Sequence, residues 1–125
     1  MTALETVNAF LKAAAARDYD TALGLLSEDI VYQNMPLPAV TGRQAVKDTL
    51  EMVLGTSSTS EWVVLRELSS DDLVMNERTD RFKIQERWVD LPVMGVFEVR
   101  GGVIIAWRDY FDLPTFTTQF TPPGA

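Results

Sequence analysis

The chain of 125 residues contains neither cysteine nor histidine. Without cysteine it can form no disulfide, no thiolate nucleophile and no cysteine-ligated zinc site. Without histidine it lacks the commonest general base and the commonest metal ligand, which excludes Ser-His-Asp and Cys-His catalytic systems. If the protein is an enzyme, its acid–base chemistry must therefore use carboxylates, tyrosine, lysine or arginine.

Basic residues are also in short supply, with 11 Lys and Arg against 18 Asp and Glu and a formal net charge of −7. An acidic chain without a basic stripe is a poor candidate for binding nucleic acid or an anionic membrane. No apolar run approaches the ~20 residues of a membrane span, and Met1–Leu11 lacks the pattern of a signal peptide. No EF-hand-type spacing of carboxylates occurs. We therefore expect a cytoplasmic protein with no metal site.

The sequence has enough apolar residues, 46%, to bury one core, and its charged content of 23% is ordinary for a globular protein. We expect a single domain over residues 1–125. Its first half shows helical signals. Thr2-Ala3-Leu4-Glu5 is a capping box followed by apolar residues at helical spacing, which predicts a helix over Ala3–Arg17. Asp20 is the expected cap of a second, shorter helix, whose apolar residues are Ala22, Leu23, Leu25 and Leu26.

A short strand, Ile30–Asn34, is predicted to end at Met35-Pro36-Leu37-Pro38, because proline cannot donate to a sheet ladder. Thr41-Gly42-Arg43-Gln44 is interpreted as a second capping box. It opens a third helix that runs to Leu54 and stops at Gly55.

From Glu61 onward the pattern is that of a sheet, with β-branched and aromatic residues in stretches separated by turn residues. The expected strands are Trp62–Leu68, Leu73–Trp88, Val93–Val99 and Val103–Phe111. The expected turns are Asp71-Asp72, Asp90-Leu91-Pro92 and Arg100-Gly101-Gly102. Helices followed by a meander predict an α+β domain, in which the helices pack on the concave face of a curved, mixed or antiparallel sheet.

Several polar residues fall on the expected core side of these strands, since side chains alternate between the two faces. Over Leu73–Ile84, Arg78 and Asp80 share a face with Val74, Asn76, Phe82 and Ile84. Asp109 shares its face with Val103, Ile105, Trp107 and Phe111, and Tyr32 and Asn34 share theirs with Ile30. Each pattern alone is more often a surface ion pair, a turn residue or a core edge, but three such strands together favour a buried site.

Charge balance then favours acid–base chemistry at this site. An unpaired buried charge costs several kcal/mol or more, and Arg78 can pair with both Asp80 and Asp109 through its planar set of donors. Two carboxylates and one guanidinium leave one excess negative charge, which a single shared proton removes. One aspartate is then a neutral acid and the other a charged base, as acid–base catalysis requires.

Three motifs in these strands match a known pattern. They are Tyr32-Gln33-Asn34, Arg78-Thr79-Asp80 and Trp107-Arg108-Asp109-Tyr110-Phe111-Asp112, and the tail Leu113-Pro114-Thr115-Phe116 follows the last of them. Over nearly the whole chain, the sequence resembles the limonene-1,2-epoxide hydrolase family, and the third motif is the most specific part. The resemblance implies a cone-shaped, cystatin-like α+β fold with a deep apolar pocket, an enzyme without a cofactor, and a homodimer formed through the sheet.

The resemblance also implies a role for each polar residue. Asp109 takes a proton from water, Tyr32 and Asn34 hold that water, Asp80 protonates the epoxide oxygen, and Arg78 bridges the two carboxylates. Water then opens the epoxide to a vicinal diol in one step, without a covalent enzyme intermediate.

The substrate pocket is expected to draw its apolar lining from the same strand faces and from the adjacent loops. The expected lining residues are Phe82, Phe111, Phe116, Met35, Ile84 and Trp107. Such a pocket selects an apolar epoxide that is cyclic, terpene-like or aryl. Two alternatives remain open on the same fold: a ketosteroid-isomerase-like proton-transfer enzyme using Tyr32 and Asp80, and a non-catalytic module that binds an apolar ligand. Arg78 argues against the first, because it favours an ionised Asp80.

Overall fold

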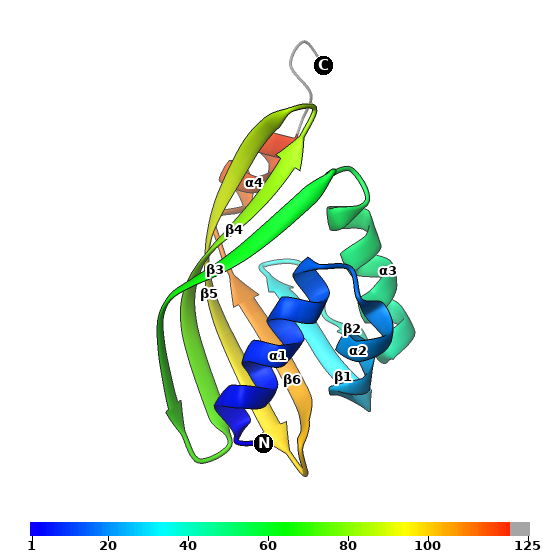
Figure 1. The fold of residues 1–125 in the computed structure, drawn as a ribbon, viewed down its shortest axis with the longest axis vertical. Helices are drawn as coiled ribbons and strands as arrows, with labels where there is room; N and C mark the ends of the chain where they lie inside the picture. Colours follow the sequence, from blue (N-terminus) through cyan, green and yellow to red (C-terminus); the bar gives the residue numbers. More distant parts are fainter. Residues whose placement is uncertain (121–125) are drawn as a thin grey trace.

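The computed structural model describes residues 1–120, which form four helices and one sheet (Figure 1). The helices are α1 (Ala3–Ala15), α2 (Tyr19–Gly24), α3 (Arg43–Leu54) and α4 (Leu113–Phe120). The strands are β1 (Leu26–Met35), β2 (Val40–Thr41), β3 (Thr59–Ser70), β4 (Leu73–Ile84), β5 (Arg87–Arg100) and β6 (Val103–Tyr110). None of the helices in this described part is long and apolar enough to cross a membrane.

The sheet is mixed, with the strand order β2-β1-β6-β5-β4-β3. The strands β3 to β6 form an antiparallel meander, whereas β1 pairs with β6 in parallel. The long strands curve around α1, which contacts β3, β4, β5 and β6 from one side (Figure 1). Buried residues of α1, among them Val7 and Phe10, join the core beneath the sheet. The predicted class, α+β with N-terminal helices on the concave face of a curved sheet, is confirmed.

The start of α1 is as predicted, but two other helix starts differ from the prediction. Thr2 and Glu5 form the capping box, with N···O distances of 2.9 and 3.1 Å. The cap of α2 is Asp18 instead of Asp20, since the Asp18 carboxylate accepts from the Thr21 amide at 3.3 Å. This helix ends at Gly24, so Leu25 lies beyond it and Leu26 opens β1.

The second predicted capping box, at the start of α3, is wrong. The N-cap of α3 is Gly42, and no side chain in the described residues caps the helix there. Gly42 has φ +95°, a backbone conformation that an L side chain rarely adopts. Arg43 instead uses its guanidinium to bond the carbonyl of Leu26, which ties the start of α3 to the start of β1.

The predicted strand Leu73–Trp88 is in fact two strands joined by a tight turn. Ile84 of β4 pairs with Arg87 of β5, and the two residues between them, Gln85 and Glu86, have φ +50° and +64°. Two consecutive positive φ values are typical of a type I′ hairpin, which usually carries Asn-Gly. Because neither residue here is glycine or asparagine, no residue type marks this turn in the sequence.

The turn predicted at Asp90-Leu91-Pro92 is correspondingly wrong, because these residues lie inside β5. Pro92 pairs with Thr79 of β4, while the pairing of β5 with β6 begins only at Met94. Pro92 thus lies where β5 has a single neighbouring strand, which is the edge condition under which strands tolerate proline.

A shift in register changes which residues of β6 face the core. Glu98 pairs with Ala106, but the next residue of β5, Val99, pairs with Ile104, so Ile105 is the extra residue of a bulge. Ile104 is therefore buried, whereas Val103 and Ile105, predicted to lie on the core side with Trp107, are only partly buried. The other two predicted faces are confirmed: even-numbered residues of β4 from Val74 to Ile84 are buried, and so are Ile30 and Tyr32 of β1.

The left-handed turn between β4 and β5 can be tested by substituting its two residues. Replacing Gln85-Glu86 by Asn-Gly should raise the free energy of unfolding by about 1 kcal/mol, because it removes the cost of the left-handed conformation. Urea or thermal unfolding measures this change. As a control, Glu67→Gly in β3, at a strand position, should destabilise the protein instead. Equal destabilisation by both changes would contradict the turn assignment.

Candidate active site

Three strands of the sheet bring five predicted polar residues to one place, with β5 between β4 and β6. Arg78 and Asp80 come from β4, Asp109 from β6, and Tyr32 and Asn34 from β1. In the parallel pairing of β1 with β6, Asn34 lies opposite Asp109 and Tyr32 opposite Trp107. The site therefore spans the sheet from β4 to β1, on the face that the helices cover.

Arg78 bonds both carboxylates. Its Nε donates to Oδ1 of Asp80 at 3.0 Å, and its Nη2 donates to Oδ2 of Asp80 at 3.1 Å and to Oδ2 of Asp109 at 2.9 Å. Arg78 is 1% exposed, and Asp80 and Asp109 are each 5% exposed. Charge-assisted bonds of this bidentate type are among the stronger ones in proteins, which offsets the cost of burying three charged groups.

The second oxygen of Asp109 is fixed by a tryptophan. Trp107 is fully buried, and its Nε1 donates to Oδ1 of Asp109 at 2.8 Å. The indole ring is stacked between Tyr32, at 3.9 Å between ring centroids, and Phe97, at 5.8 Å. Trp107 thus acts as a rigid support that orients the carboxylate, because its own ring cannot shift without disturbing the core.

Tyr32 and Asn34 form a second polar pair beside Asp109. The hydroxyl of Tyr32 donates to Oδ1 of Asn34 at 3.0 Å. This bond leaves the amide nitrogen of Asn34 as a donor and the oxygen of Tyr32 as an acceptor. Burial raises the pKa of the Tyr32 hydroxyl, and the nearby charge of Asp109 raises it further. The tyrosine therefore remains a neutral hydrogen-bonding group.

Burial and the neighbouring charges also set the protonation of the central groups. Burial raises the pKa of Asp80 and outweighs the opposing effect of Arg78, and the charge of Asp109 adds to the rise. Burial opposes the charge on Arg78, but the Asp109 and Asp80 carboxylates overcome it and raise the pKa of the guanidinium. A permanently charged Arg78 beside an Asp80 that holds its proton more readily is consistent with one proton shared within the group.

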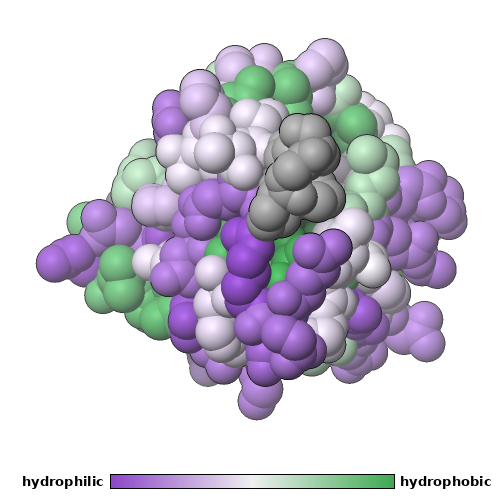
Figure 2. Space-filling view, turned by 90° about the horizontal axis from the view of Figure 1, so that it is seen from above, coloured by the Kyte–Doolittle hydropathy of each residue, from purple (hydrophilic) through white to green (hydrophobic). Residues whose placement is uncertain are grey.

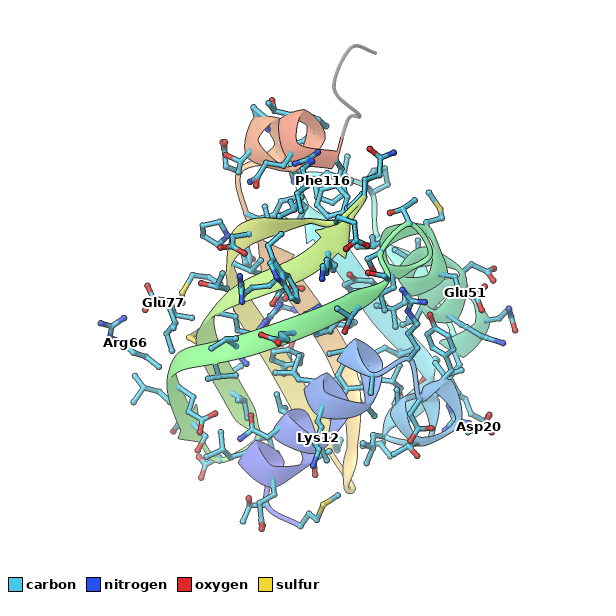
Figure 3. The ribbon with its side chains drawn as sticks, turned by 45° about the horizontal axis from the view of Figure 1, so that its top comes forward. Lys12, Asp20, Glu51, Arg66, Glu77 and Phe116 are labelled. Atoms are coloured by element: carbon cyan, nitrogen blue, oxygen red, sulfur yellow. The ribbon has the colours of Figure 1, made fainter. Side chains whose placement is uncertain are left out.

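An apolar cavity of about 180 Å³ opens next to these groups. Its lining residues are Tyr32, Asn34, Leu37, Thr49, Leu50, Met52, Val53, Trp62, Asp80, Phe82, Leu91, Val93, Asp109, Phe111 and Phe116. Figure 3 shows Phe116 on the side of α4 that faces the strands. At the end of the molecule that carries α4, hydrophobic residues are visible between hydrophilic ones (Figure 2).

Three of the six predicted lining residues line this cavity: Phe82, Phe111 and Phe116. The other three do not. Trp107 lies beneath Tyr32 in the core, and Ile84 packs in the core at the end of β4. Met35, predicted in a loop, is the last residue of β1 and pairs with Tyr110, on the opposite face of the sheet from Asn34.

The lining residues that come from α3 and β5 were not predicted from the sequence. Leu91 was missed because residues 90–92 carried the signature of a turn, and Val93 because it was placed at the start of a strand and not within β5. Thr49, Leu50 and Val53 lie on one side of the predicted third helix, and their helical spacing could have identified them once that helix was placed against the sheet.

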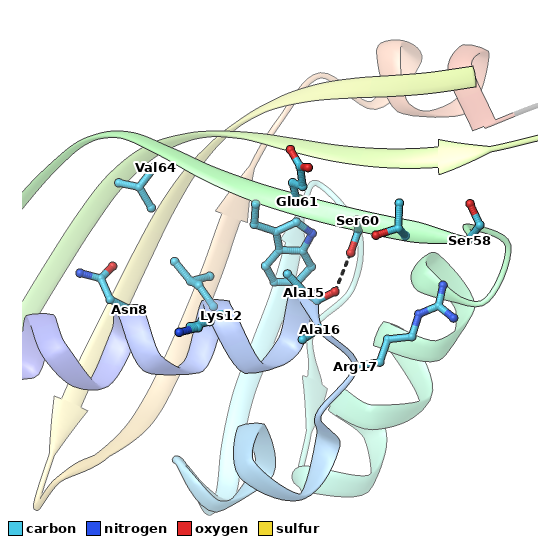
Figure 4. A pocket seen from close by; sticks show the side chains of 12 residues that line it. Asn8, Lys12, Ala15, Ala16, Arg17, Ser58, Ser60, Glu61 and Val64 are labelled. Atoms are coloured by element: carbon cyan, nitrogen blue, oxygen red, sulfur yellow. Dashed lines mark hydrogen bonds between the residues drawn. The ribbon is translucent and has the colours of Figure 1, made fainter. Parts of the chain in front are cut away.

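A larger hollow, about 540 Å³, lies between α1 and β3 (Figure 4). Asn8, Lys12 and Glu61 are among its lining residues, and Ser60 there donates to the carbonyl of Ala15 at 2.8 Å. None of the five polar residues of the site lines it. Chemistry rather than size therefore assigns the site to the smaller cavity, where buried acids meet an apolar wall.

Known proteins of similar fold carry several different names. An NTF2-like protein of unknown function from Burkholderia pseudomallei superposes with a TM-score of 0.86, at 17% identity, over 98% of this chain and 99% of that one. A putative polyketide cyclase from Xanthomonas campestris has a TM-score of 0.82 at 22% identity, over 95% of this chain and 96% of that one. At such identities the likeness establishes the NTF2-like fold and nothing more.

Sequence similarity is more specific. The model of the limonene-1,2-epoxide hydrolase catalytic domain matches residues 1–121. The epoxide hydrolase EphG of Mycobacterium tuberculosis is 36% identical over 108 residues, which cover 86% of this chain and 71% of that protein. A solved structure of an M. tuberculosis epoxide hydrolase of this type is 34% identical, with a TM-score of 0.81 over 94% of this chain and 87% of that one. The chain therefore belongs to the limonene-1,2-epoxide hydrolase family and is an epoxide hydrolase of that type.

Proposed function

We propose that the protein adds water to a small apolar epoxide, giving a vicinal diol, and that the bridged pair Asp80–Arg78–Asp109 performs the acid–base chemistry. The observation that carries this proposal is the link made by Arg78 between two buried carboxylates at the edge of an apolar cavity. Such a cavity can hold the hydrocarbon part of an epoxide. The two aspartates lie where the epoxide oxygen and the attacking water would be.

In the proposed reaction, the ionised carboxylate of Asp109 accepts a proton from water, and the water oxygen forms a bond to an epoxide carbon. The C–O bond of the ring breaks, and the departing oxygen takes the proton held by Asp80. Asn34 and Tyr32 orient the water through the free amide nitrogen and the hydroxyl oxygen. Each positioned acid or base typically contributes ~10²–10⁴-fold to the rate, and orientation of the water adds to this.

In the proposed reaction, the buried group of Asp80, Arg78 and Asp109 carries one exchangeable proton at the start and at the end. Before the reaction the proton lies on Asp80, and after it the proton lies on Asp109. Arg78 remains charged and bonds both carboxylates, so the net charge of the buried group is the same at both stages. The pair regains its starting state when the proton returns from Asp109 to Asp80.

The size of the cavity indicates the size of the substrate. Its volume is about 180 Å³, while a dry protein cavity of about 150 Å³ is known to accommodate benzene. We therefore propose a substrate with a single ring, such as a cyclic or small aryl or terpene-like epoxide. Phe82, Phe111 and Phe116 supply aromatic walls for such a ring.

We also propose that two copies of the chain pair through the outer face of the sheet. On that face, Met75, Met94 and Tyr110 are between 42% and 45% exposed, and Met94 and Tyr110 are paired neighbours on β5 and β6. Beside Met94 the same face also carries an ion pair, since Glu77 is the neighbour of Met94 on β4 and bonds Arg66, and both side chains point away from the sheet (Figure 3). The cytoplasmic location stays a prediction.

Replacing the proposed base should abolish most of the activity. With limonene oxide, cyclohexene oxide and styrene oxide as substrates, Asp109→Asn is expected to lower the rate of diol formation by ~10²–10⁴-fold, because the amide cannot take a proton from water. Chromatography of the diol measures this loss. Asp90→Asn, at an exposed residue paired with Arg81, is the matched control and should retain activity. A wild-type protein that forms no diol from any of the three would contradict the proposal.

Trp62 should limit the size of the substrate. It lines both the 180 Å³ cavity and the larger hollow between α1 and β3, so its ring lies between the two spaces. Trp62→Leu is expected to raise kcat/KM for limonene oxide relative to cyclohexene oxide by ~10-fold, a typical effect of reshaping an apolar pocket. Competition between the two substrates measures this ratio. Trp88→Leu, on the outer face, should leave it unchanged, and an unchanged ratio in both variants would remove Trp62 from this role.

The proposed dimer predicts a particle of twice the 14.0 kDa chain mass by light scattering. Met94→Glu places a carboxylate beside Glu77, its paired neighbour on β4, and should yield the monomer, because like charges side by side are costly to bury. A monomeric wild type at micromolar concentration would contradict the dimer.

A further inference from the structure

Arg78 and Asp109 lie on strands that are not neighbours. Asn76 of β4 pairs with Gly95 of β5, and Gly95 pairs with Asp109 of β6, so these three residues form one row across the sheet. Arg78 lies two residues further along β4, opposite Val93. Because β5 separates Arg78 from Asp109, the guanidinium must cross over β5 to reach the carboxylate.

Gly95 provides the space for this crossing. A Cβ atom at Gly95 would lie 2.3 Å from Nη1 of Arg78, 2.7 Å from Oδ1 of Asn76 and 2.9 Å from the ring of Phe97. The backbone of Gly95 does not have the positive φ of Gly101 or Gly102. Glycine is therefore required here for room and not for conformation, since the guanidinium occupies the volume that any side chain would take.

Asn76 holds the remaining side of the guanidinium. Its Oδ1 accepts from Nη1 of Arg78 at 2.8 Å, and the residue is 1% exposed. Since Arg78 can only donate, this contact fixes which end of the amide is the oxygen. The Nδ2 of Asn76 is then buried with no hydrogen-bond partner in residues 1–120, and leaving a buried donor unpaired lowers stability.

An aspartate at this position would accept from Arg78 without leaving an unpaired N–H group. It would also add a third carboxylate beside the two of Asp80 and Asp109. The neutral amide of Asn76 therefore lowers the stability of the protein somewhat. In return, it adds no charge to the buried group of Asp80, Arg78 and Asp109, and we infer that this is why asparagine occupies the position.

We propose that Asn76 and Gly95 are positioning residues that hold the guanidinium of Arg78 between Asp80 and Asp109, and that the neutrality of Asn76 limits this buried group to a single exchangeable proton. The inference rests on the proposed function, in which that proton serves the reaction. Neither residue lines the cavity, so both act through Arg78. In the described residues, the ionisable groups that face Asp80 are Arg78 from β4 and Asp109 from β6, and Asp109 in turn bonds Arg78 and lies beside the neutral Tyr32 of β1.

Gly95→Ala tests the need for space. Because the added methyl displaces the guanidinium, kcat should fall by ~10–100-fold while KM changes little, since the cavity wall is untouched. Gly24→Ala is the matched control, because no described atom lies within 4 Å of a Cβ at that position. Thermal unfolding shows whether each variant is folded, and full activity of a folded Gly95→Ala variant would overturn the role of Gly95.

Asn76→Asp tests the need for neutrality while keeping the shape of the side chain. A third carboxylate should raise the pKa of the other two by like-charge repulsion. Asp109 must be ionised to act as the base, so the acidic limb of the pH–rate profile moves to higher pH. Asp80 must be protonated to act as the acid, and burial already raises its pKa. Because the added carboxylate raises that pKa further, the alkaline limb of the profile also moves to higher pH. Asn8→Asp, which adds the same charge in the separate hollow between α1 and β3, should leave both limbs in place.

A measurement without substrate separates this inference from the proposed function. Carboxyl ¹³C NMR on protein labelled at aspartate follows the titration of Asp80 and Asp109 directly. In Asn76→Asp both titrations should move to higher pH relative to the wild type and to Asn8→Asp. Diol formation with unmoved titrations would overturn the inference and leave the function standing. Moved titrations in a protein that forms no diol would support the inference and refute the function.

Discussion

The shared guanidinium of Arg78 is the interaction on which the rest of the site depends. Two carboxylates can remain buried on this sheet because one cation bonds both of them, and the cation can reach both only because the strand between them leaves room. The surrounding aromatic residues reinforce the arrangement: the rings of Trp62 and Phe97 each lie 6.0 Å from the guanidinium carbon. A low-polarity setting of this kind strengthens the ion pairs and makes the loss of any one of them costly.

The sequence predicted the parts of this arrangement that follow from alternation along strands. Arg78, Asp80, Asp109, Tyr32 and Asn34 were all placed on the core side, and the structure brings them together. The features that were not predicted depend on backbone geometry, and no particular residue type marks them in the sequence. The turn at residues 85–86 contains no glycine or asparagine, and the bulge at Ile105 arises from pairing between strands. The crossing of Arg78 over Gly95 likewise became visible only with the register of three strands in place.

The fold and the chemistry of this protein are separate matters. Structures with TM-scores above 0.8 include an NTF2-like protein and a putative polyketide cyclase at identities of 17% and 22%, so the curved sheet with helices on one face does not by itself select a reaction. On the inner face of β1, β4 and β6, this chain carries polar residues among apolar ones. In the proposed reaction a histidine-free sequence performs acid–base chemistry there, with a pair of carboxylates as the acid and the base.

The parallel contact between β1 and β6 has a consequence for how the molecule is made. The hairpins of the meander join neighbours in sequence, but Asn34 meets Asp109 roughly 75 positions later in the chain. Contacts between such distant segments require closure of a long loop before they are formed, and they form more slowly than the hairpins. On the ribosome, the amino-terminal half is synthesised well before its partner strand emerges. Tyr32 and Asn34 of β1 can therefore meet Asp109 only after the last strand of the sheet has been made, so the group of five buried polar residues assembles late in folding.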